Sequence, residues 1–132
     1  MRHHSMALAA LLALSGAANA QDAGEGGQIF ARYCAACHGT DARGNGVMAE
    51  VLTLVPPDLT GLGQGADFPV LQVVRQIDGR DPLLAHGGEM PIFGMWFEGD
   101  GADVALPGPG GQPILVSRPI ADLVTFLISV QS

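Results

Sequence analysis

The sequence predicts an all-α domain that follows an N-terminal export signal. Apolar residues recur at helical spacing over three segments, residues 26–36, 67–77 and 120–130. Loops rich in glycine and proline separate these segments, because the 132 residues include 19 Gly and 9 Pro. One pair of short strand-like runs, 104–106 and 114–116, allows no more than a small β-hairpin. We therefore expect one small domain of helices joined by irregular loops.

Residues 1–20 have the order of segments that defines an export signal. Arg2 gives a positive start, residues 6–16 are apolar, and Ala18-Asn19-Ala20 is a small-x-small cleavage site. The apolar run is shorter than the roughly 20 residues that cross a bilayer. We expect a periplasmic protein with a mature domain over residues 21–132 and no membrane span. A buried helix or a retained anchor is the alternative.

The charge balance narrows the classes of partner. The chain has 13 acidic and 6 basic residues, a formal charge of −7, and no lysine. Loss of Arg2 with the signal would add one more unit of negative charge. Binding to a phosphate backbone needs clustered positive charge, so a nucleic-acid partner is not expected. A redox protein with a basic docking patch is the expected kind of partner.

The chemistry of the chain centres on its two cysteines. Cys34 and Cys37 are directly followed by His38, which gives the spacing C-x-x-C-H. This spacing is typical of covalent attachment of a c-type haem, in which both thiols bond one haem edge and the histidine reaches the iron. A disulfide, a thioredoxin-like pair and a zinc site are weaker alternatives. A helix rather than a strand is predicted before the motif, and no further cysteine could complete a zinc site. One motif predicts one haem c.

The first helix is expected over residues 26–36 because Ile29, Phe30 and Tyr33 share one face. The helix should end near Gly39, since glycine readily adopts the conformation that closes a helix.

The middle of the chain is expected to be mostly loop. A polar loop and one or two helical turns are predicted between residues 40 and 54, and the prolines of segment 56–60 require extended or turned backbone. The second helix should start at Asp67-Phe68-Pro69 and end at Asp78-Gly79. A loop is expected over residues 80–95.

The last helix is expected over residues 120–130 and follows an irregular segment, residues 98–116. This segment is rich in glycine and proline, and it is predicted to form either a loop or the small β-hairpin.

Four side chains could provide a second axial ligand for a haem iron: Met48, His86, Met90 and Met95. Met90 is preferred because it lies in a glycine-rich loop and because Pro91 restricts it to an extended backbone. His86 is the main rival, and ligation by two histidines would give a lower reduction potential than ligation by methionine and histidine. Met90 could instead only fill a gap in the core, and an open sixth position is a separate possibility.

In order and spacing, these motifs resemble the class I cytochromes c, and most of all the small periplasmic monohaem cytochromes c of proteobacteria. The resemblance covers most of the mature chain. It rests on Gly27, Phe30 and Cys34 to Gly39, on Gly44-Asn45-Gly46, on Pro56 to Thr60, on Met90-Pro91 with Gly94, and on Ile120 to Leu127. The chain departs from the family pattern in the 98–116 insertion and in lacking every lysine of the mitochondrial protein's lysine ring.

The resemblance implies a cytochrome c fold, in which N- and C-terminal helices cross beside one covalent haem. Gly26 or Gly27 and Phe30 would pack against Leu123 and Phe126.

The resemblance also implies the ligands of the iron. His38 would be the proximal ligand, with the carbonyl of Pro56 or Pro57 accepting its Nδ1 hydrogen, and Met90 would be the distal ligand. Arg75 or Arg80 would either pair with a haem propionate or remain a solvated charge at a helix end.

Three functions are therefore considered. The first is a periplasmic one-electron carrier, and the second is the haem-bearing subunit of a periplasmic oxidoreductase complex, with the 98–116 insertion as a docking element. The third is a haem sensor of gases with a labile Met90. No Ser/His/Asp or paired-carboxylate arrangement can be built, so we do not expect an enzyme. The protein would be a monomer or a subunit of a complex.

Overall fold

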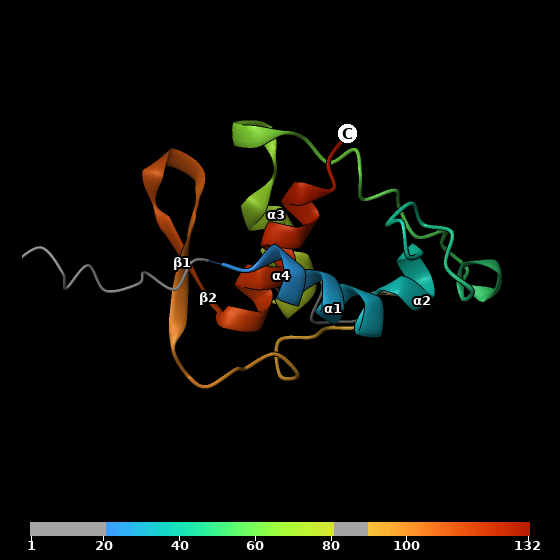
Figure 1. Cartoon of the computed structure of the whole chain (residues 1–132), viewed down its shortest axis with the longest axis horizontal. Coiled ribbons are helices and arrows are strands. Elements are labelled where there is room, and N and C mark those ends of the chain that lie inside the picture. The colour runs from blue at the N-terminus through green and yellow to red at the C-terminus, as the bar shows by residue number, and fades with distance from the viewer. Residues whose placement is uncertain (1–20, 81–89) are drawn as a thin grey trace, which may run out of the picture.

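The computed structural model describes residues 21–80 and 90–132. The export signal expected over residues 1–20 and the rival ligand His86 lie outside the described residues. The helices are α1 (Ala23–Tyr33), α2 (Ala35–His38), α3 (Val70–Asp78) and α4 (Arg118–Ser129), the strands are β1 (Asp103–Pro107) and β2 (Pro113–Ser117), and short 3₁₀ turns lie at Ala49–Val51, Gly65–Asp67 and Pro109–Gly111. Figure 1 shows the hairpin and α2 at opposite ends of the molecule. The expectation of an all-α domain is thus correct only in part, because a two-stranded antiparallel sheet accompanies the helices.

Helix α1 begins three residues earlier than its apolar pattern predicts. The Asp22 side chain caps the helix by accepting hydrogen bonds from the backbone N–H groups of Gly24 at 2.7 Å and Glu25 at 3.2 Å. The Asp22 N–H in turn donates to Oδ1 of Asp122 in α4 at 2.8 Å. The glycines at positions 24, 26 and 27 have a low helix propensity, and the Asp22 cap together with the contact to Asp122 stabilises the helix despite them.

Helices α1 and α4 cross at the glycines of α1. A Cβ atom at Gly26 would collide with the backbone carbonyl of Asp122, so only glycine permits this close approach. The rings of Phe30 and Phe126 lie 5.1 Å apart between centroids, and Leu123 is fully buried in the same core. The crossing implied by the family resemblance is therefore present, with Gly26 at its centre.

Helix α4 starts two residues before its predicted start. Pro119 lies in its first turn, where the missing N–H of proline has no helical partner to lose. Helix α3 ends at Asp78 and is closed by Gly79 in the left-handed conformation, as predicted, but Pro69 precedes its first turn instead of lying in it. No helix among residues 21–80 and 90–132 is long and apolar enough to cross a membrane.

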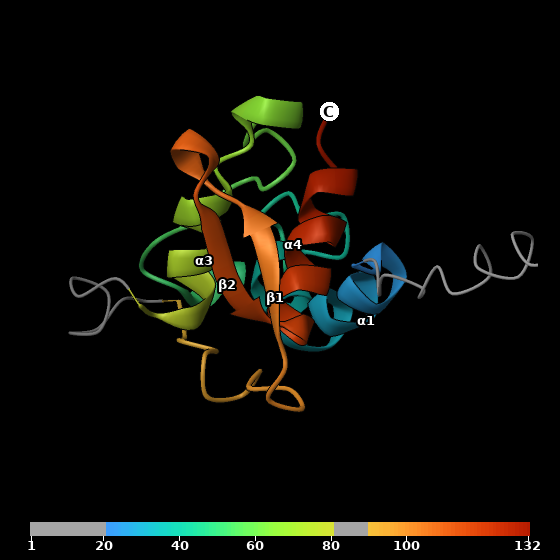
Figure 2. The ribbon, with the colours of Figure 1, turned by 90° about the vertical axis from the view of Figure 1, so that its left-hand side faces the viewer.

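The 98–116 insertion contains the predicted hairpin, and its apolar face belongs to the core. Val104 pairs with Val116, and Leu106 pairs with Ile114. Leu106, Ile114 and Val116 are buried, and Figure 2 shows the two strands lying across α3 and α4. The prolines that end each strand, Pro107 and Pro113, stand opposite each other and limit the ladder to five residues a side.

Candidate haem-binding site

The C-x-x-C-H motif lies at the break between α1 and α2. Helix α1 ends at Tyr33 and is capped by Cys34, whose N–H donates to the carbonyl of Phe30 at 2.9 Å. The chain then turns once more as α2, in which the N–H of His38 donates to the carbonyl of Cys34 at 2.9 Å, and Gly39 ends this turn with a φ of 79°. One helical turn therefore presents both cysteines and the histidine together, which the uninterrupted helix expected from the sequence did not specify.

Both cysteines are free thiols, and their environments differ. Cys34 is buried, whereas Cys37 is partly exposed. Burial, and in second place the neighbouring Cys37, raises the pKa of the Cys34 thiol to about 11. The Cys34 thiol of the folded chain therefore stays protonated at neutral pH.

His38 is held in the tautomer that an iron ligand needs. Its Nδ1 lies 3.4 Å from the carbonyl oxygen of Pro57. Because a carbonyl can only accept, Nδ1 carries the ring proton and Nε2 keeps its lone pair. Among the described residues, the ring's polar contact is the one from Nδ1 to Pro57, which leaves Nε2 available to a metal. Burial lowers the pKa of His38, which the Pro57 contact partly opposes, so the ring favours the neutral form that binds metals.

The loop between residues 39 and 60 places Pro57 over the motif. The N–H of Gly44 donates to the carbonyl of His38 at 2.7 Å, and the N–H of Gly46 donates to the carbonyl of Cys37 at 3.1 Å. A Cβ atom at Gly44 would collide with the carbonyl of Pro56, and one at Gly46 would collide with the carbonyl of Ala36. The Gly44-Asn45-Gly46 sequence is thus needed for close backbone packing around the motif.

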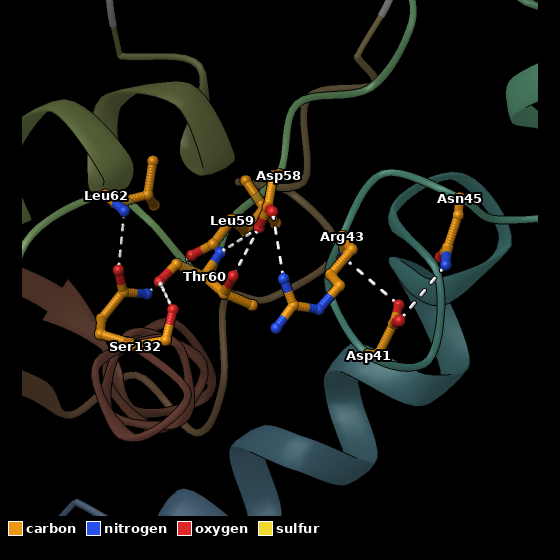
Figure 3. Close-up of polar contacts among 9 residues, drawn as sticks. Asp41, Arg43, Asn45, Asp58, Leu59, Thr60, Leu62 and Ser132 are labelled. Atoms are coloured by element: carbon orange, nitrogen blue, oxygen red, sulfur yellow. Dashed lines mark hydrogen bonds and ion pairs between the residues drawn. The ribbon is translucent and has the colours of Figure 1, made fainter.

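Polar contacts tie the two ends of this loop together (Figure 3). Asp58 accepts from the N–H of Thr60 at 2.8 Å and from its hydroxyl at 2.7 Å, and it pairs with Arg43 at 3.5 Å. The hydrogen bonds from Thr60, helped by Arg43, lower the pKa of Asp58. Asp41 accepts from the side-chain amide of Asn45 at 3.3 Å, which steadies the glycine turn.

The three methionines of the described domain have different surroundings. Met90 is partly buried and packs against the hydrophobic core. Met95 is 83% exposed, and Met48 is 43% exposed on the loop beside α2. Of these thioethers, Met90 is the one that already contacts the core, but its role as a ligand stays a prediction.

The two arginines considered as partners of a haem propionate, Arg75 and Arg80, differ in their contacts. Arg80 pairs with Asp78, and its guanidinium donates to the carbonyl of Leu115 at 3.1 Å, so it joins the end of α3 to the hairpin. Arg75 is exposed on α3. Pairing of either arginine with a propionate stays a prediction.

The residues of the motif fit a covalent haem. Two free thiols one helical turn apart can each form a thioether bond, and the adjacent imidazole presents an unpaired nitrogen. A cleft of about 920 Å³ lies elsewhere, between residues 65–76 and the hairpin tip, and none of the cysteines, His38 or Met90 lines it. The donor set, and not this cleft, therefore defines the site.

Sequence reasoning missed the residues that support the site from a distance. Gln131 accepts from the N–H of Leu62 at 2.7 Å and donates to the carbonyls of Leu59 and Leu127, both at 2.7 Å. Gln131 follows the apolar stripe of the last helix, and its sequence neighbours carry no signal for a partner some 70 positions away.

A helical domain with a C-x-x-C-H turn and an oriented histidine defines a protein that carries c-type haem. The family model of cytochrome c matches residues 23–131, and the chain belongs to the cytochrome c family. Comparisons with curated proteins and with solved structures returned no match. Family membership implies a covalent haem c at Cys34 and Cys37 and a part in haem-based electron transfer.

Proposed function

We propose that the chain is a periplasmic class I cytochrome c of the small proteobacterial type, which carries one electron at a time. In this proposal His38 and Met90 are the axial ligands, and the chain is a carrier and not an enzyme. The observation that carries the proposal is the orientation of His38, because the Pro57 contact leaves Nε2 available beside two free thiols.

Each residue of the motif has a separate task. Cys34 and Cys37 provide the thioether bonds, and His38 provides a neutral imidazole whose Nδ1 proton stays on the Pro57 carbonyl. This hydrogen bond fixes the orientation of the ring and makes Nε2 a stronger electron-pair donor to the iron. Met90 would provide a thioether ligand, and methionine ligation raises the reduction potential. The bound haem supplies the Fe(III)/Fe(II) couple.

The surface beside the motif is suited to brief docking. The loop that packs on α2 exposes Val47, Val51 and Val55, and the N–H of Met48 anchors it by donating to the carbonyl of Ala36 at 2.8 Å. A small apolar surface on an acidic chain favours weak, salt-dependent docking with a partner that carries a basic patch.

The alternative role as a subunit of an oxidoreductase complex gains less support. Its proposed docking element was the insertion, but the apolar face of the hairpin is already covered by the protein's own core. Leu115 is the large apolar side chain of the two strands that remains exposed. Copurification with a larger subunit that resists salt would favour this role over that of a carrier.

Absorption spectra of the haem-loaded protein test the proposed ligands. The oxidised wild type should show the weak long-wavelength Fe(III)–thioether band, and the reduced protein should not bind CO. Met90→Ala should lose the band and bind CO, whereas the controls Met95→Leu and His86→Ala should retain the wild-type spectra. Rapid CO binding by the wild type would overturn the proposal and favour the gas sensor.

A further inference from the structure

The residue before the first cysteine belongs to a chain of aromatic rings. The Tyr33 ring meets the Phe97 ring edge-on with centroids 5.3 Å apart, and Phe97 stacks on Phe93 at 5.5 Å. Phe97 is 5% exposed, and the Arg32 guanidinium covers the Tyr33 ring at 5.4 Å. We refer to Tyr33, Phe93 and Phe97 as the aromatic clamp. It connects the α1 end of the attachment motif with the segment that carries Met90.

The segment from Met90 to Phe97 contains no helix or strand, so a few contacts fix its position. The N–H of Phe93 donates to the carbonyl of Ile77 at 2.8 Å. Gly94 packs so closely on the carbonyl of Asp78 that a Cβ atom there would collide with it. These contacts hold the segment against the end of α3, and on the other side the clamp holds it against α1.

We propose that Tyr33 and Phe97 are positioning residues that keep Met90 in place as the sixth ligand. This inference rests on the proposed function. Met90 lies three residues before Phe93, and in this proposal its thioether leaves the iron when this segment shifts. The shift would separate Phe97 from Tyr33, because Tyr33 is fixed on α1 beside Cys34. The aromatic contacts therefore favour the ligated state over the open one.

The effect of the clamp can be measured with an added ligand that competes with Met90. An external ligand binds the open state, so its apparent affinity rises in proportion to the population of that state. Aromatic pairs contribute enough beyond their burial to change such a population by about 2- to 10-fold.

Imidazole titration of the oxidised, haem-loaded protein is the test. Tyr33→Leu and Phe97→Leu should bind imidazole about 2- to 10-fold more tightly than the wild type. Tyr33→Phe keeps the aromatic ring and should bind imidazole as the wild type does. Phe126→Leu is the matched control, because it removes another aromatic pair of α1, the one with Phe30, without touching the Met90 segment. Urea unfolding of each variant measures its general loss of stability.

The outcomes separate the clamp from the ligand assignment. The clamp is overturned if Tyr33→Leu and Phe126→Leu raise the imidazole affinity equally, or if Tyr33→Leu leaves this affinity unchanged. In either case the Fe(III)–thioether band of the wild type would still support the proposed ligands. If the wild type lacks the thioether band, the proposed function fails first, and the clamp fails with it.

Discussion

Gln131 couples the end of α4 to the loop that follows Pro57 in the sequence. Its amide oxygen accepts from the N–H groups of Leu62 and Gly63, and its amide nitrogen donates to two carbonyls. The hydroxyl of the following residue, Ser132, donates to the carbonyl of Thr60 at 3.2 Å (Figure 3), and the backbone N–H of Ser132 donates to the same carbonyl at 2.9 Å. A single side chain therefore satisfies backbone groups from two segments that are far apart in the sequence.

Gln131→Ala should reduce the free energy of unfolding by about 1–3 kcal/mol, because the partly buried groups left without partners are costly. Gln72→Ala, on an exposed position of α3, is the control and should stay within about 0.5 kcal/mol of the wild type. Urea unfolding of the haem-loaded proteins checks both values. A Gln131→Ala protein as stable as the control would show that water replaces these bonds without cost.

Asp58 should contribute to the pH dependence of stability. Its pKa in the folded chain is lowered, first by the Thr60 hydrogen bonds. The stabilisation is therefore complete above the usual carboxyl pKa of about 4 and is lost as the pH falls through the lower folded value. Between about pH 5 and pH 3, unfolding free energy should fall less steeply in Asp58→Asn than in the wild type.

Thr60→Val provides the matched control for Asp58. It removes the hydroxyl that donates at 2.7 Å and keeps the backbone N–H that donates at 2.8 Å, so it should flatten the pH profile only in part. Identical slopes for the wild type and Asp58→Asn would contradict the effect assigned to this carboxylate.

At the scale of elements, the crossing of α1 and α4 depends more on Gly26 than on Gly27. A methyl group at Gly26 meets the rigid backbone of Asp122, whereas one at Gly27 comes within 3.2 Å of the Phe126 ring, which can move. Gly26→Ala should therefore cost about 1–3 kcal/mol in urea unfolding, in the range of overpacked cores, and Gly27→Ala distinctly less. Equal losses would mean that the two helices slide apart easily.

The elements could be predicted where the pattern is local. The stripe of α4, the Gly79 end of α3 and the existence of a small hairpin follow from local sequence patterns, whereas the register of the hairpin came from the structure. The start of α1 could not be predicted, because it depends on the Asp22 cap and on Asp122, which lies 100 positions away. The attachment motif was evident from its spacing, whereas the choice of Pro57 over Pro56 and the aromatic clamp required the tertiary fold.

At the scale of the whole molecule, the charge should govern encounters with redox partners. The formal charge is −7, and the Debye length shortens from about 30 Å at 0.01 M salt to about 8 Å at 0.15 M. The electron-transfer rate with a basic redox protein, measured by stopped flow, should fall steeply over this range. With an acidic redox protein the rate should rise with salt. An electron-transfer rate with the basic partner that does not change with salt concentration would contradict electrostatic docking.

The burial of Cys34 has a consequence for the order in which the mature protein is assembled. The folded chain encloses this thiol and keeps it protonated, with a pKa of about 11, and a protonated thiol is a poor nucleophile. The motif precedes α4 along the chain, and α4 completes the core against α1. We therefore expect the thioether bond of Cys34 to form most readily before the two helices meet. In a chain that folds before it meets haem, the Cys34 thiol would already be buried and less able to react with the cofactor.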